Sequence, residues 1–86
     1  MNEGEAKELI AWALREKGVQ FDEASLKIRY FEDSWDRLDA YGEFVNSEGY
    51  FEFAVSVEGK KKIKRFHVNM IMPRSVYEDM KKLKRE

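Results

Sequence analysis

The chain has 86 residues, 43% of them hydrophobic and 38% charged, and it contains no cysteine. This length predicts one domain covering residues 1–86, and the lack of cysteine excludes a disulfide framework and a zinc–thiolate site. The net charge of −1 combines an acidic part, residues 1–58, with 14 Asp or Glu and 6 Lys or Arg, and a basic part, residues 59–86, with 3 and 10. Because a field of this kind affects association rather than folding, it directs attention to binding partners.

The first expected element is an amphipathic helix over residues 3–17. Asn2 followed by Glu5 predicts a capping box at its start, and Gly18 predicts a left-handed stop at its end. Its apolar side chains recur with helical spacing and are expected to face the core: Ala6, Leu9, Ile10, Ala13 and Leu14.

Four β-strands are expected next, because the apolar period changes to two at Leu26. The alternating segments are residues 26–31, 38–45, 51–58 and 65–72. Regular alternation places Tyr30 and Met72 on the inner face of the sheet, and Phe31 and Ile63 on the outer face. The connections between the segments are short, so neighbouring strands are expected to run antiparallel.

A second helix is expected after Pro73, which has no backbone donor and therefore ends the last strand. Val76, Met80 and Leu83 form the apolar line of this helix, and lysines gather in its last turn. The order α-β-β-β-β-α predicts an α+β fold: a four-stranded antiparallel meander with two helices packed on one face.

Few side chains in the sequence are suited to catalysis. His67 is the only histidine, and it is expected to be solvated on the outer face of a strand. Asp33, Asp36 and Asp39 could approach one another around the first hairpin, but they lack the glycine and the bidentate glutamate of a calcium loop. We therefore expect no enzyme activity, no catalytic residue, no metal site and no cofactor.

The basic part of the chain favours nucleic-acid binding. Its lysines and arginines gather in the last hairpin and the final helix, where they could neutralise the phosphates of single-stranded DNA or RNA. The candidate residues are Lys60, Lys61, Lys62, Lys64, Arg65, Arg74, Lys81, Lys82, Lys84 and Arg85. In the alternative interpretation, acidic side chains of the outer face pair with Arg29 and Arg65, and the lysines serve solubility.

The second functional hypothesis is a protein-interaction module, either a homodimer or an adaptor, that uses the outer face of the sheet. That face is more apolar than a solvated face requires. The candidate interface residues are Phe31, Trp35, Tyr41, Val45, Tyr50 and Ile71. Trp35 lies in a polar turn, and it is expected either to fold back onto the core margin, the preferred interpretation, or to anchor a partner.

The sequence also bears on the compartment in which the protein works. The first residues lack a basic leader, and no apolar run approaches the roughly 20 residues needed to span a bilayer. We therefore expect a soluble, cytoplasmic protein with no membrane partner. The high content of Lys and Glu resembles the composition of thermophile proteins.

Overall fold

The structure of the chain is a computed structural model that describes residues 1–59 and 61–84, with side chains up to Leu83 within the last helix. Its order confirms the expected α+β meander. The elements are α1 (Glu3–Glu16), the short 3-10 helix η1 (Glu23–Ser25), β1 (Lys27–Ser34), β2 (Arg37–Asn46), β3 (Gly49–Glu58), β4 (Lys62–Pro73) and α2 (Arg74–Lys84). The strands lie in the order β1-β2-β3-β4, and each neighbouring pair is antiparallel.

Both ends of α1 are fixed as the sequence predicts. Asn2 and Glu5 form a reciprocal capping box, because each side chain accepts a hydrogen bond from the backbone N–H of the other, at 2.8 and 3.0 Å. At the other end Gly18 has a φ of 75°, and the N–H of Val19 donates to the carbonyl of Leu14 at 2.9 Å. This is the C-terminal geometry for which glycine is favoured.

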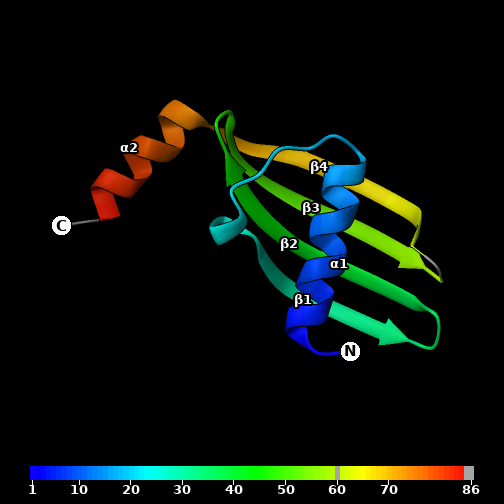
Figure 1. The fold of residues 1–86 in the computed structure, drawn as a ribbon. Helices are drawn as coiled ribbons and strands as arrows, with labels where there is room; N and C mark the ends of the chain where they lie inside the picture. Colours follow the sequence, from blue (N-terminus) through cyan, green and yellow to red (C-terminus); the bar gives the residue numbers. More distant parts are fainter. Residues whose placement is uncertain (60, 85–86) are drawn as a thin grey trace.

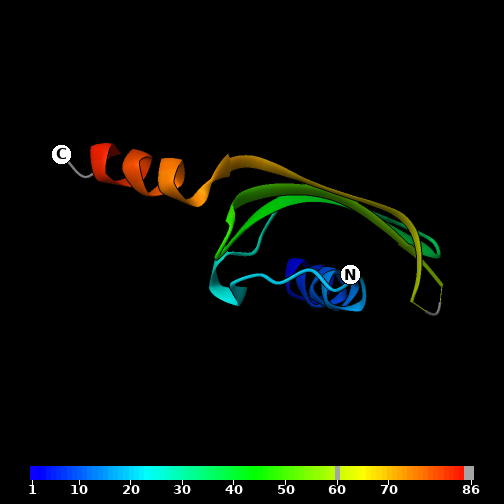
Figure 2. The same ribbon diagram turned by 90° about the horizontal axis from the view of Figure 1, so that it is seen from above.

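Helix α1 lies against the inner, concave face of the curved sheet (Figures 1 and 2). The core is centred on Phe44, whose ring stacks on Phe51 and Phe53 at centroid distances of 5.2 and 6.3 Å. Gly42 allows the close packing beside these rings, since an added Cβ would lie 2.0 Å from the carbonyl oxygen of Lys27. The buried hydrophobic residues are Ala6, Ile10, Ala11, Ala13, Leu14, Leu26, Leu38, Ala40, Phe44, Phe53, Val55 and Val57.

Three β-bulges change which side chains face the core. The strand pairing leaves Arg29, Lys64 and Ile71 as extra residues, and each extra residue reverses the alternation beyond it. The expected faces are therefore wrong at four positions. Phe31 and Ile63 pack against the core, while Tyr30 pairs with Tyr41 and Met72 pairs with Tyr50 on the outer face.

Helix α2 does not share the face that α1 covers. It continues beyond the end of β4 and points away from the sheet (Figures 1 and 2). The expectation of two helices on one face is thus correct for α1 and wrong for α2. The reason is the connection: β4 ends at Pro73 and α2 begins at Arg74, so no loop allows the chain to turn back over the inner face. The ring of Tyr77 stacks instead on Tyr50, an outer-face residue, at 5.5 Å.

Candidate functional site

Helix α2 is attached to the sheet through its first residue, Arg74. The backbone N–H of Arg74 donates to the carbonyl of Glu48 at 2.9 Å, and its guanidinium donates to the carbonyl of Asn46, also at 2.9 Å. The same guanidinium binds Glu78 one turn later, at 2.9 Å. Arg74, which the sequence placed among the phosphate-binding candidates, therefore holds α2 on the β2–β3 hairpin.

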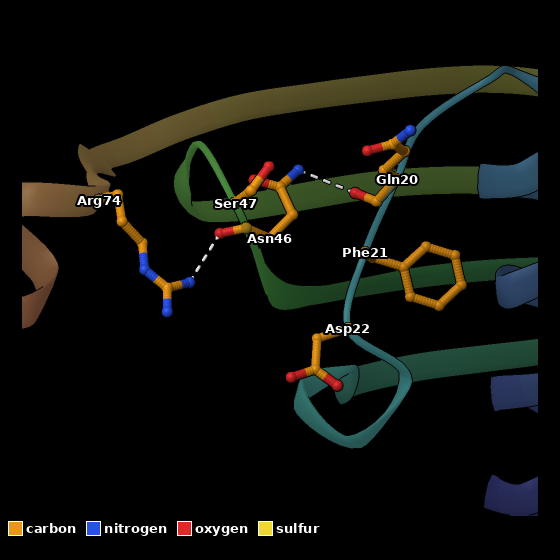
Figure 3. Close-up of a pocket in the computed structure, with 6 residues that line it drawn as sticks. All are labelled: Gln20, Phe21, Asp22, Asn46, Ser47 and Arg74. Atoms are coloured by element: carbon orange, nitrogen blue, oxygen red, sulfur yellow. Dashed lines mark hydrogen bonds between the residues drawn. The ribbon is translucent and has the colours of Figure 1, made fainter.

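A shallow hollow of about 580 Å³ lies beside this attachment, between the hairpin and the loop that follows α1 (Figure 3). The side chain of Asn46 closes one wall by donating to the carbonyl of Gln20 at 2.8 Å. The other lining residues are Phe21, Asp22 and Ser47. Asp22 is occupied in capping η1 through the N–H of Ala24. The hydrogen bonds around the hollow hold the loops in place, and its lining residues are not arranged as a catalytic group.

The basic candidate residues do not form one track. Lys61, Lys62, Lys64 and Arg65 lie at the β3–β4 hairpin, whereas α2 begins at the opposite end of β4 (Figure 1). At about 3.3 Å per residue, β4 separates the basic residues of the hairpin from the start of α2 by roughly 35 Å. The ammonium of Lys61 also lies 5.3 Å from the ring of Trp12 on α1. Lys60, Arg85 and the side chain of Lys84 lie outside the described residues.

Acidic and basic side chains of the outer face form ion pairs, as the alternative interpretation expected for Arg29, whereas Arg37 takes the role expected for Arg65. Arg29 binds both carboxylate oxygens of Glu43 at 3.0 Å, and this pairing lowers the pKa of Glu43. The hydroxyl of Ser56 donates to Asp39 and, together with the Arg37 guanidinium, lowers the pKa of the Asp39 carboxyl. These pairs neutralise Arg29 and Arg37 on the outer face.

The candidate interface residues do not form one patch: Tyr41, Val45 and Tyr50 share the outer face, with Val45 opposite Tyr50, whereas Phe31 and Trp35 lie elsewhere. Phe31 is on the core side, and Trp35 is fully exposed, so the preferred expectation that Trp35 folds back is wrong. Trp35 has a φ of 53° in the β1–β2 turn, a conformation that favours glycine and turns the ring away from the core. Tyr41 is half-exposed and donates to Glu52 at 3.0 Å, while Val45 is half-buried.

A cleft of about 300 Å³ separates α2 from the outer face of the sheet. The stacked rings of Tyr50 and Tyr77 line it, and the ammonium of Lys81 lies 5.5 Å from the Tyr77 ring. Burial and the neighbouring Glu43 carboxylate raise the pKa of Tyr50. The lining residues are Lys27, Arg29, Glu43, Tyr50, Met72, Tyr77, Met80 and Lys81. Three cations thus face one acid, Glu43, which Arg29 already binds.

The apolar line of α2 remains largely exposed in the structure, although Met80 also lines the cleft that faces the sheet. Val76, Met80 and Leu83 are exposed to 45%, 43% and 68%. Met70 and Ile71, near the end of β4, are also half-exposed, but Met70 lies opposite Phe51 on the inner face of the sheet. We call Val76, Met80 and Leu83 the α2 surface. The sequence identified the apolar line but assigned it to the core; the direct junction of Pro73 and Arg74 was the signal that the helix could not fold back.

A second apolar depression lies on the other side of the molecule, between α1 and η1. This α1–η1 groove has a volume of about 270 Å³. Its lining residues are Gly4, Lys7, Glu8, Ala11, Phe21, Glu23 and Leu26. Phe21 packs edge-on against Phe44, so the groove is continuous with the core beneath it.

Among residues 1–59 and 61–84, no cluster of His, Asp or Glu side chains is arranged to hold a metal ion. His67 is exposed on the outer face, opposite Ala54. In the same described part of the chain, neither helix has the length and apolar content needed to cross a bilayer. Comparisons with protein-family models, curated proteins and solved structures found no match to the chain.

Proposed function

We propose that this chain is a cytoplasmic, non-enzymatic protein-interaction module whose contact region is the α2 surface. The carrying observation is that an amphipathic helix projects from the sheet with its apolar line exposed. Contiguous exposed apolar surface of this kind marks interaction sites on soluble domains. The earlier hypothesis placed the contact on the outer face of the sheet, but the paired charges of that face favour α2 instead.

The energetics of a short helix support the same proposal. Eleven residues form a helix that is marginal in water without packing, because nucleation fixes several residues for each hydrogen bond gained. The described contacts of α2 with the sheet are the Tyr50–Tyr77 stack and the bonds of Arg74, near its base. A partner that covers Met80 and Leu83 would stabilise the outer turns of the helix by removing apolar surface from water.

The test uses two variants of α2, each of which introduces one negative charge. Val76→Glu places it on the α2 surface, and Ser75→Glu places it on the neighbouring exposed position as a matched control. We expect the wild type and the control to associate, with themselves or with a captured protein, and Val76→Glu to lose that association. Sedimentation and affinity capture measure this. A monomeric wild type whose captured proteins are the same for both variants would contradict the proposal.

A second candidate function, nucleic-acid binding, is favoured by the cleft between α2 and the sheet. Two tyrosine rings and the ammonium groups of Lys27 and Lys81 combine a stacking surface for a base with positive charge for a phosphate. The ligand class is single-stranded DNA or RNA. This candidate relocates the expected contact from the basic hairpin to the cleft.

Fluorescence anisotropy of a labelled single-stranded oligonucleotide tests this candidate. Binding should weaken steeply with salt and should be lost on Lys27→Glu with Lys81→Glu. The matched pair Lys62→Glu with Lys64→Glu, at the other end of β4, should retain binding. If only the Lys62→Glu with Lys64→Glu variant loses oligonucleotide binding, the binding site lies at the hairpin. If binding does not depend on salt, nucleic acid is not the ligand.

A further inference from the structure

We infer that the partner of α2 is a second copy of this chain, and that α2 of each copy docks in the α1–η1 groove of the other. This inference rests on the proposed function and names the occupant of the α2 surface. It is carried by three properties that the helix and the groove share: their polarity, their length and their opposite charge.

The lining of the groove suits the apolar side of an amphipathic helix. Ala11, Phe21 and Leu26 are its apolar lining, and three charged side chains, Lys7, Glu8 and Glu23, also line it. The carboxylate of Glu23 binds the guanidinium of Arg15. Residue 4 is a glycine, so no side chain fills that end of the groove. A volume of about 270 Å³ accommodates large aliphatic side chains but not a whole helix. The expected contact is therefore a helix lying over the groove with side chains inserted.

The groove and the apolar line of α2 have the same length. Along α1 the groove extends from Gly4 to Ala11, and along α2 the apolar line extends from Val76 to Leu83. Each interval is seven residues, which is about 10 Å of helix. Val76, Met80 and Leu83 follow the i, i+4, i+7 pattern by which amphipathic helices enter apolar grooves.

The charges favour this groove over pairing of α2 with another α2. Glu3–Glu16 carries four glutamates against Lys7 and Arg15, and Lys17, Asp22 and Glu23 follow. Helix α2 carries four basic residues against Glu78 and Asp79. Docking α2 beside α1 brings opposite charges together, whereas two α2 helices in contact bring like net charges together.

The fold favours a contact between copies. The groove lies on the inner side of the sheet, between α1 and η1, whereas α2 extends beyond the end of β4 and its own cleft opens on the outer face (Figures 1 and 2). Helix α2 points away from the groove of its own chain. In a two-fold dimer, α2 of each copy docks in the groove of the other, so the contact is made twice. The buried area is then twice that of one contact, which brings it closer to the area of a stable interface.

Cross-linking between copies is the first test, because the chain has no cysteine of its own. Lys7→Cys places a thiol at the groove and Met80→Cys places one on α2. Under mild oxidation the mixture should give a covalent dimer that contains one of each. Met80→Cys mixed with Ser34→Cys, in the distant β1–β2 hairpin, should give far less. Disulfide links between two copies of the Met80→Cys variant, in place of links between the Met80→Cys and Lys7→Cys variants, would overturn the inference.

Charge reversal is the second test, and it separates this inference from the proposed function. Glu8→Lys with Glu23→Lys should weaken self-association about tenfold, and so should Lys81→Glu with Lys82→Glu. Mixing the two variants should restore it. Glu16→Lys with Glu32→Lys makes the same change in charge away from the groove and should have little effect. If Val76→Glu abolishes association while the groove reversal does not weaken it, this inference fails and the proposed function stands. A wild type that stays monomeric to high micromolar concentration overturns the inference by itself.

Discussion

The two helices of this chain have the same kind of apolar pattern and opposite surroundings. Helix α1 buries its apolar line completely, with Ile10 and Leu14 at 0% exposure, whereas Leu83 on α2 is 68% exposed. The periodicity of each sequence identifies a helix and its apolar side. It does not say what covers that side.

The difference comes from the connections. Ten residues, 17–26, separate α1 from β1, and they include η1, which turns the chain from the helix layer into the sheet. No residue separates β4 from α2. A helix joined directly to a strand continues in the direction of that strand, so α2 leaves the sheet. In this molecule the length of the linker decides which apolar line becomes core and which remains exposed.

The largest expected difference between the two helices is the effect of a leucine-to-alanine substitution on the free energy of unfolding. Leu14→Ala should lower the free energy of unfolding by about 2–5 kcal/mol, because it leaves a cavity between α1 and the sheet. Leu83→Ala should change it by less than about 0.5 kcal/mol at a concentration where the chain is monomeric. Urea denaturation measures both. Equal effects would mean that α2 is packed as α1 is.

The helix ends provide a smaller test. Asn2→Ala removes the capping box of α1 and should lower the free energy of unfolding by about 1 kcal/mol. Ser75→Ala, in the first turn of α2, should have almost no effect, because unfolding of the core does not depend on α2. A comparable loss in both variants would show that the two helices unfold as one unit.

The attachment of α2 can be weakened without touching the core. Arg74→Ala removes the side-chain bonds to Asn46 and Glu78, each a hydrogen bond whose net value is about 1 kcal/mol. We expect amide hydrogen exchange in α2 to become several-fold faster, while exchange in α1 stays unchanged. Lys82→Ala, on the same helix, is the control. Unchanged exchange in α2 would show that the Tyr50–Tyr77 stack and the backbone bond of residue 74 to Glu48 are enough to hold the helix.

The smallest expected effect concerns pH and the outer face. Because Arg29 lowers the pKa of Glu43 in the folded state, the pair stabilises the fold above the ordinary glutamate pKa of about 4.3 and loses that contribution as the pH falls through the lowered value. Arg29→Gln should therefore lower stability slightly at pH 7 and have no effect near pH 2. Titration by NMR should show the pKa of Glu43 rising in the variant. A Glu43 pKa that does not change would contradict the pairing.

Most of the fold could be predicted from the sequence because its local signals agree. Period, turn residues and caps all favour one helix, four strands and a final helix, and all of these elements form. Local signals failed where one extra residue changed the register. Arg29 interrupts the alternation of β1 and moves Phe31 to the core, and nothing in its side chain marks it as a bulge residue.

The candidate site was less predictable, because it depends on how elements meet. The outward apolar set was expected to form one interface, but Trp35 lies in a hairpin turn, Tyr50 is covered by Tyr77, and Phe31 is on the core side. Clustering of basic residues in the sequence also suggested clustering in space. The twelve residues of β4 separate the two groups instead.

The bulges at Lys64 and Ile71 also affect how the chain behaves when crowded. Strand β4 is an outer strand of the sheet, and such an edge can template the stacking of strands from other chains into fibrils. The two bulges limit its regular stretch to residues 65–70, and a charged side chain stands at its start. An edge interrupted in this way is a poor template for aggregation. The molecule can therefore expose apolar side chains on α2 while its β4 edge resists amyloid-type assembly.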